Sequence, residues 1–215
     1  MNLSLRLKEY FNLLVFSKKI FCKPEKKDIL IFDSELSEFL IHYFNKEKVH
    51  VLDNRYKQHR NQKLNIFILF KMAIKFKFNS YEYFKTYLNY VRPKLILTLI
   101  DNNKTFYKLK EMYPKAKTML VQNAWRSADG DDIFKNMDEL LADKLKCDLI
   151  LSFNNHVGKI FKSFLHGEIV PIGSFRSNHN IKKNLKEKYE YLFISIFRDP
   201  NVMHECHFDL LRTIN

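Results

Sequence analysis

The sequence is poor in glycine, proline and cysteine: its 215 residues include four Gly, five Pro and three Cys. It contains no glycine-rich phosphate loop, which argues against a P-loop enzyme or a Rossmann dehydrogenase. The widely separated Cys22, Cys147 and Cys206 suit a reducing compartment. No apolar run approaches the roughly 20 residues that span a bilayer, and the start lacks a signal-peptide cleavage site. We therefore expect a cytoplasmic protein, soluble or peripheral on the inner face of the membrane.

Positive charge is abundant, and the formal net charge is +13. Clustered Lys and Arg bind nucleic-acid phosphates by releasing counterions, but here Lys outnumbers Arg and the basic residues are dispersed along the chain. We therefore do not expect nucleic-acid binding as the main function. Contact with an anionic membrane surface or with phosphate-bearing substrates fits the same charge equally well.

Short apolar runs alternate with helical patterns along most of the chain. Apolar residues predict six strands, at 28–32, 49–52, 95–100, 119–121, 148–153 and 168–172. Between them we predict helices with one apolar face, including one capped by Ser34, a buried one over 64–78 and one capped by Ser80. The run at 95–100 is almost continuously apolar, which is typical of a parallel strand covered on both faces. The fold class is therefore α/β, with a doubly wound, mostly parallel, Rossmann-like sheet.

Composition divides the chain into four predicted parts. Residues 1–24 form a basic amphipathic segment, either a helix packed on the domain or an in-plane membrane anchor. Residues 25–175 form the Rossmann-like domain, and the polar stretch 176–190 is a linker. Residues 191–215 hold one strand-like run and little else, which indicates the start of a second, truncated domain unless that strand joins the first sheet.

Polar clusters follow three predicted strands, where open parallel sheets bind their ligands. They are Asp101-Asn102-Asn103, then Gln122-Asn123 with Arg126, then Ser152 to Asn155. Helix capping explains Asn154 and Asn155. The first two clusters contain more polar side chains than a helix cap requires. An arginine beside two amides also suits anionic or hydroxyl-rich ligands. The sequence therefore predicts a ligand site at one edge of the sheet.

Two other clusters could suggest a metal. Asp129-Gly130-Asp131 matches the short acidic motif of some glycosyltransferases, but capping and solvation explain it. His204-Glu205-Cys206-His207 contains potential zinc ligands whose adjacent spacing fits no common zinc site. We therefore predict no metal and no cofactor.

An ordered set of short motifs resembles bacterial surface-carbohydrate biosynthesis proteins. The set comprises Leu99 to Asn103, Phe106 to Leu109, Val121 to Asn123 with Arg126, Asp132 to Phe134, Ile172 to Phe175 with Asn178, and Phe193 to Ser195 with Arg198. These proteins look like two-domain GT-B glycosyltransferases. The resemblance covers roughly 27–198 and departs from the pattern at Ala124-Trp125, where a small residue would be expected after Gln-Asn.

The resemblance implies a glycosyltransferase, or its N-terminal part, in bacterial surface polysaccharide biosynthesis. It implies a saccharide or lipid-linked acceptor in the visible half, and a nucleotide-sugar donor held by the C-terminal domain. Asp101 is the candidate catalytic residue. The candidate substrate-binding residues are Asn102, Asn103, Gln122, Asn123, Arg126 and Arg198. A non-catalytic saccharide- or partner-binding module is the alternative, and a basic nucleic-acid-binding protein is the third.

Overall fold

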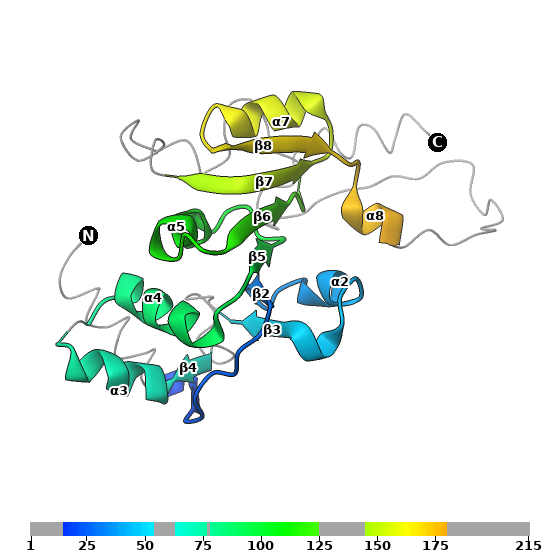
Figure 1. The fold of residues 1–215 in the computed structure, drawn as a ribbon. Helices are drawn as coiled ribbons and strands as arrows, with labels where there is room; N and C mark the ends of the chain where they lie inside the picture. The colour runs from blue at the N-terminus through cyan, green and yellow to red at the C-terminus, as the bar shows by residue number, and fades with distance from the viewer. Residues whose placement is uncertain (1–14, 54–62, 77, 125–144, 180–215) are drawn as a thin grey trace, which may run out of the picture. The chain divides into compact units, whose positions relative to one another are not determined.

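The main sheet has six parallel strands. We describe a computed structural model of the chain over residues 15–53, 63–76, 78–124 and 145–179. The strand order is β3-β2-β5-β6-β7-β8 (Figure 1), and every neighbouring pair is parallel. The strands are β2 (Ile29–Phe32), β3 (Val49–Leu52), β5 (Leu95–Thr98), β6 (Lys117–Val121), β7 (Lys146–Ser152) and β8 (His166–Pro171). The six predicted strands and the α/β fold class are confirmed.

Helices cover both faces of this sheet. One face carries α3 (Ile66–Ile74), α4 (Ser80–Val91), α5 (Lys104–Met112) and α7 (Asn155–Lys162), and the other carries α2 (Ser37–Ile41) and α8 (Phe175–His179). Successive strand residues point to opposite faces, so Leu30 and Phe32 join the core under the first set of helices while Ile31 joins the other. The strands are thus apolar on both sides, as the continuous apolar runs predicted.

The segment before the main sheet differs from its prediction. Instead of a helix continuing to residue 23, Lys18–Ile20 forms strand β1. It pairs in parallel with β4 (Lys63–Asn65) to make a separate two-stranded sheet. The Asn65 side chain reinforces this arrangement by donating to the carbonyl oxygen of Cys22 at 3.0 Å. Strand pairing therefore overrides the helical spacing here, and the predicted helix is wrong for 18–20. Residues 1–14 lie outside the described chain.

Two predicted helix caps are also wrong. Ser34 does not cap α2, whose N-cap is Leu36 in a left-handed conformation with no side-chain bond. The cap of α4 is Asn79, one residue before Ser80, and its Oδ1 accepts from the Glu82 backbone N–H at 2.8 Å. An asparagine immediately before the helix satisfies a free N–H from the cap position, so the serine becomes the first helical residue.

The helix predicted over 64–78 is shorter and less buried than expected. It is α3, Ile66–Ile74, preceded by β4. Ile68 and Met72 are buried, whereas Phe70 is 61% exposed and Ile74 is 58% exposed. One face of this helix therefore packs on the domain, and another presents apolar side chains to solvent.

The chain divides into two compact units, Met1–Ile181 and Lys182–Asn215. All of the second unit, including the strand-like run predicted within 191–215, lies outside the described residues. Helix α8 stands where the predicted linker begins. The four-part division of the chain stays a prediction.

Candidate functional site

The carboxyl ends of the six parallel strands share one edge of the sheet. The chain runs from β2 outward to β3, returns to the other side of β2 at β5, and then continues outward to β8. The strand order therefore reverses between β2 and β5. In open parallel sheets ligands bind at such a reversal, beyond the carboxyl ends of the strands.

Buried polar residues lie at this edge on four successive strands. Asp33 follows β2, Asp101 lies in the loop after β5, Gln122 follows β6, and Ser152 ends β7. Each is at most 2% exposed. Because burying a polar group costs free energy unless it is hydrogen-bonded, these residues must be held by specific partners. We call this set, with the loops that carry it, the carboxyl-edge site.

Asp33 adopts a backbone conformation that is rare for a residue with a side chain. Its φ is 92°, in the region that favours glycine. Its backbone N–H donates to the carbonyl of Leu52 at 2.8 Å, and its Oδ1 accepts from the Glu35 N–H at 3.2 Å. The loop after β2 is thus fixed by a strained, buried aspartate at the strand-order reversal. The sequence-based site prediction did not include Asp33, although a carboxylate directly after the first predicted strand is a usable signal.

The predicted cluster after β5 separates into residues with different surroundings. Asp101 is 2% exposed, and its carbonyl oxygen accepts from the Tyr107 hydroxyl at 2.6 Å. Asn102 is exposed. Asn103 caps α5, because its Oδ1 accepts from the Thr105 N–H at 3.1 Å. Asp101 is therefore locked in position on the opposite side of the reversal from Asp33.

Gln122 joins the ends of β6 and β7. Its Oε1 accepts from the Phe153 N–H at 2.8 Å, and its Nε2 donates to the carbonyl of Ala124 at 2.8 Å. Both ends of the amide thus bond to main-chain groups. The side chain holds the loop that presents Asn123, which makes Gln122 a positioning residue. The two loops that carry Asp101 and Gln122 share an edge, because β5 and β6 are adjacent and parallel.

Arg176, on α8, brings a cation to the same edge. Its guanidinium donates to Oδ1 of Asn123 at 3.2 Å and lies over the Phe39 ring, 5.3 Å from the centroid. Arg176 is nevertheless an exposed residue. The sequence-based site prediction did not include Arg176, because residues 176–190 were predicted to be a linker.

The turn into α8 depends on backbone contacts with β7. The Ile172 N–H donates to Ser152 and the Gly173 N–H donates to Phe153, at 2.8 and 3.1 Å. Gly173 has a φ of 76°, which a side chain would disfavour. These contacts direct the chain from β8 toward the loop after β6.

The remaining site predictions lie outside the described residues. Arg126 and Arg198 are both outside them, so the structure places neither.

The described residues confirm one predicted helix cap. Asn154 caps α7, with its Oδ1 accepting from the Val157 N–H at 2.9 Å. Within the described residues no three His, Cys, Asp or Glu side chains come together as potential metal ligands. The edge therefore offers carboxylates, amides and an arginine, a set that can bind hydroxyl groups and an anion.

Comparison with known proteins gives one family match. Residues 119–212 match a family described as "putative O-antigen biosynthesis protein". The match covers less than half of the chain, from β6 onward. It includes Gln122, Asn123 and Arg176 but neither Asp33 nor Asp101. No curated protein and no solved structure matches the chain.

None of the helices in the described residues is both long and apolar enough to cross a membrane.

Proposed function

We propose that this protein acts in surface polysaccharide biosynthesis, as a glycosyltransferase or as a part of one, and that its carboxyl-edge site binds the acceptor saccharide. The observation that carries the proposal is the position of two buried aspartates, Asp33 and Asp101, on either side of the strand-order reversal. The family match supports the polysaccharide context through the part of this edge that begins at β6.

The chemistry of the edge suits a saccharide acceptor. Carboxylate oxygens accept hydrogen bonds from sugar hydroxyls, and amides such as Asn102 and Asn123 can both donate and accept. In glycosyl transfer the acceptor oxygen bonds to the anomeric carbon, the bond to the nucleotide diphosphate breaks, and the hydroxyl proton passes to a base. Asp101 is our candidate for that base. We assign the donor to none of the described residues.

Arg176 supports an anionic ligand at this edge. Its guanidinium, held over Phe39 and against Asn123, can pair with a carboxylate or phosphate. An acidic sugar of the acceptor would supply that group.

Binding of O-antigen oligosaccharides to the full 215-residue chain tests the proposal. Saturation-transfer NMR with oligosaccharides released from purified O-antigen should give signals with the wild type. Because hydrogen bonds to a charged group are worth about 1.5–3 kcal/mol, Asp101→Asn should weaken binding by tenfold or more. Asp28→Asn is the matched control, since Asp28 pairs with Lys94 before the amino ends of β2 and β5.

A turnover assay distinguishes a glycosyltransferase from a non-catalytic saccharide-binding module. If the 215-residue chain is itself the enzyme, it should release nucleotide diphosphate when given an oligosaccharide acceptor and a panel of nucleotide sugars, and Asp101→Asn should abolish this release. Saccharide binding without turnover in any combination would favour the non-catalytic module. If no oligosaccharide binds, or if Asp101→Asn binds as well as the wild type, the assignment of the site is wrong.

A further inference from the structure

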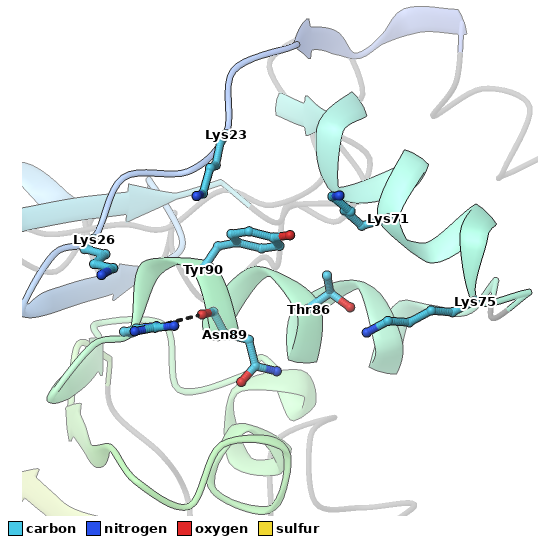
Figure 2. Close-up of a pocket in the computed structure, with 8 residues that line it drawn as sticks. Lys23, Lys26, Lys71, Lys75, Thr86, Asn89 and Tyr90 are labelled. Carbon is cyan, nitrogen blue, oxygen red and sulfur yellow. Dashed lines mark hydrogen bonds between the residues drawn. The ribbon is translucent and has the colours of Figure 1, made fainter.

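A second concave site lies among α3, α4 and the segment before β2, away from the carboxyl-edge site. It is a pocket of about 380 Å³ lined by Lys23, Lys26, Lys71, Lys75, Thr86, Asn89, Tyr90 and Arg92 (Figure 2). Arg92 follows α4 and Lys26 precedes β2, so the pocket lies toward the amino ends of β2 and β5. It also lies outside the residues of the family match.

The lining of this basic pocket contains five cationic residues and no acidic one. The nearest acidic residues in sequence are engaged elsewhere: Glu25 pairs with Lys27 at 3.1 Å, and Asp28 pairs with Lys94 at 3.0 Å. None of the ion pairs found in the described chain involves a cation of the pocket. Like charges gathered without a counterion repel one another, so the pocket is suited to an anion that offsets them.

Aromatic rings hold two of the lysines in place. The ammonium of Lys23 lies 5.4 Å from the centroid of the Tyr90 ring, and that of Lys71 lies 5.5 Å from the centroid of Phe67. The two rings pack edge to face, with centroids 5.1 Å apart. Figure 2 shows Lys71 and Lys75 extending from α3 toward α4, and Lys23 and Lys26 approaching from the segment before β2. The four lysines thus come from two separate segments around one aromatic pair.

An exposed apolar strip adjoins the basic pocket on α3. Phe70 and Ile74 are one helical turn apart and immediately precede Lys71 and Lys75 in sequence. With Phe76 and Phe78 they are 58% to 89% exposed. A helix that presents apolar residues beside lysines is typical of a surface that rests on a membrane. Contiguous exposed apolar side chains commonly mark a surface that binds a partner or a membrane.

We propose that the basic pocket binds the phosphate headgroup of an anionic lipid and that the strip formed by Phe70, Ile74, Phe76 and Phe78 enters the lipid layer beside it. Lysines bind phosphate as point charges, and the Thr86 hydroxyl and the Asn89 amide add hydrogen-bonding groups to the lining. This site is independent of the proposed sugar-binding function, because it involves none of the residues of the carboxyl-edge site.

Vesicle flotation with the full-length chain tests this proposal. The protein should float with phosphatidylcholine vesicles that contain phosphatidic acid and remain unbound with phosphatidylcholine alone. Each lysine near an anionic surface contributes about 1 kcal/mol, so Lys71→Gln with Lys75→Gln should weaken binding roughly 10- to 30-fold. The matched control is Lys159→Gln with Lys162→Gln on α7, which removes two exposed lysines outside the pocket.

A second variant and a soluble probe separate a lipid from a free phosphate. Phe70→Ser with Ile74→Ser changes exposed positions, so the protein should stay folded by circular dichroism while its vesicle binding falls at least several-fold. Inorganic pyrophosphate should compete only weakly with the vesicles. The lipid proposal would be overturned if the two double-lysine variants lost vesicle binding equally. It would also be overturned if the serine variant bound vesicles as well as the wild type, or if the protein bound pyrophosphate tightly but did not bind vesicles.

Discussion

At the residue scale, the carboxyl-edge site rests on side chains in unfavourable positions. Asp33 combines burial with a φ of 92°, and strain of this kind often accompanies function. Its Oδ1 bond to the Glu35 N–H offsets part of the cost. The strained backbone therefore makes Asp33 a candidate for ligand contact at the proposed site.

Replacing Asp33 should show how much its side chain stabilises the loop after β2. Asp33→Asn keeps an amide oxygen for the Glu35 N–H and should leave the free energy of unfolding near that of the wild type. Asp33→Ala loses that bond and should cost about 1 kcal/mol. Urea denaturation measures both. If alanine were as stable as asparagine, the side-chain bond would not fix the loop.

Asp148 should make the stability of the fold depend on acid pH. Burial alone would raise its pKa, but hydrogen bonds from Lys110 and from the backbone and side chain of Thr118 outweigh this effect and lower the pKa from 3.8. Because the folded pKa lies below the unfolded one, the stabilisation is present above about pH 4 and is lost as the pH falls further.

A comparison of urea midpoints at neutral and acid pH tests this dependence. Wild-type protein should lose more stability than Asp148→Asn between pH 7 and pH 3, although the variant is less stable at pH 7. Equal losses in the two proteins would show that Asp148 is not the group responsible.

At the scale of elements, β8 pairs closely with β7 because it contains Gly167. A Cβ on Gly167 would lie 1.9 Å from the carbonyl oxygen of Cys147, a main-chain atom. The pairing of β7 and β8 is irregular between Lys146 and Leu149. This glycine therefore permits the close approach that places the end of β8, and then α8 with Arg176, at the carboxyl edge.

Gly167→Ala should accordingly destabilise the protein by about 1–3 kcal/mol, as overpacking does. Glu168→Ala is the control, because Glu168 is exposed on the same strand. Thermal unfolding followed by circular dichroism measures the difference. Equal melting temperatures for the two variants would mean that β8 can shift without cost.

The strands were predictable because burial on both faces leaves continuous apolar runs, such as Leu95 to Ile100. The cap of α4 was misassigned by one residue because Asn79 and Ser80 can both cap a helix. Strand β1 was missed because its pairing partner, β4, lies more than 40 residues further along the chain.

The candidate site was predictable only in part. Gln122 and Asn123 directly follow β6, and Asp101 directly follows the apolar run at 95–100, so these polar residues stand out in the sequence. Asp33 was missed because its place beside the strand-order reversal depends on the order of the strands in the sheet, which the sequence does not show. Arg176 was missed because its contact with Asn123 joins residues 53 positions apart.

At the scale of the whole molecule, the net charge of +13 bears differently on the two proposed sites. Vesicle binding at the basic pocket depends on several exposed lysines and should fall steeply as salt rises, because the Debye length shortens. Saccharide binding depends on hydrogen bonds to buried aspartates and on one cation, Arg176, so it should fall much less steeply. Titrations in low and high salt check this contrast, and a parallel loss of both activities would contradict separate sites.

Hydrogen exchange upon saccharide binding tests the central claim most directly. With O-antigen oligosaccharides bound to the full-length protein, we predict added amide protection in the loops at 33–36, 99–103 and 122–124 and in the turn at 172–176. Protection confined to α3 and α4, with the loops after β2, β5 and β6 unchanged, would contradict a saccharide site at the carboxyl edge of the sheet.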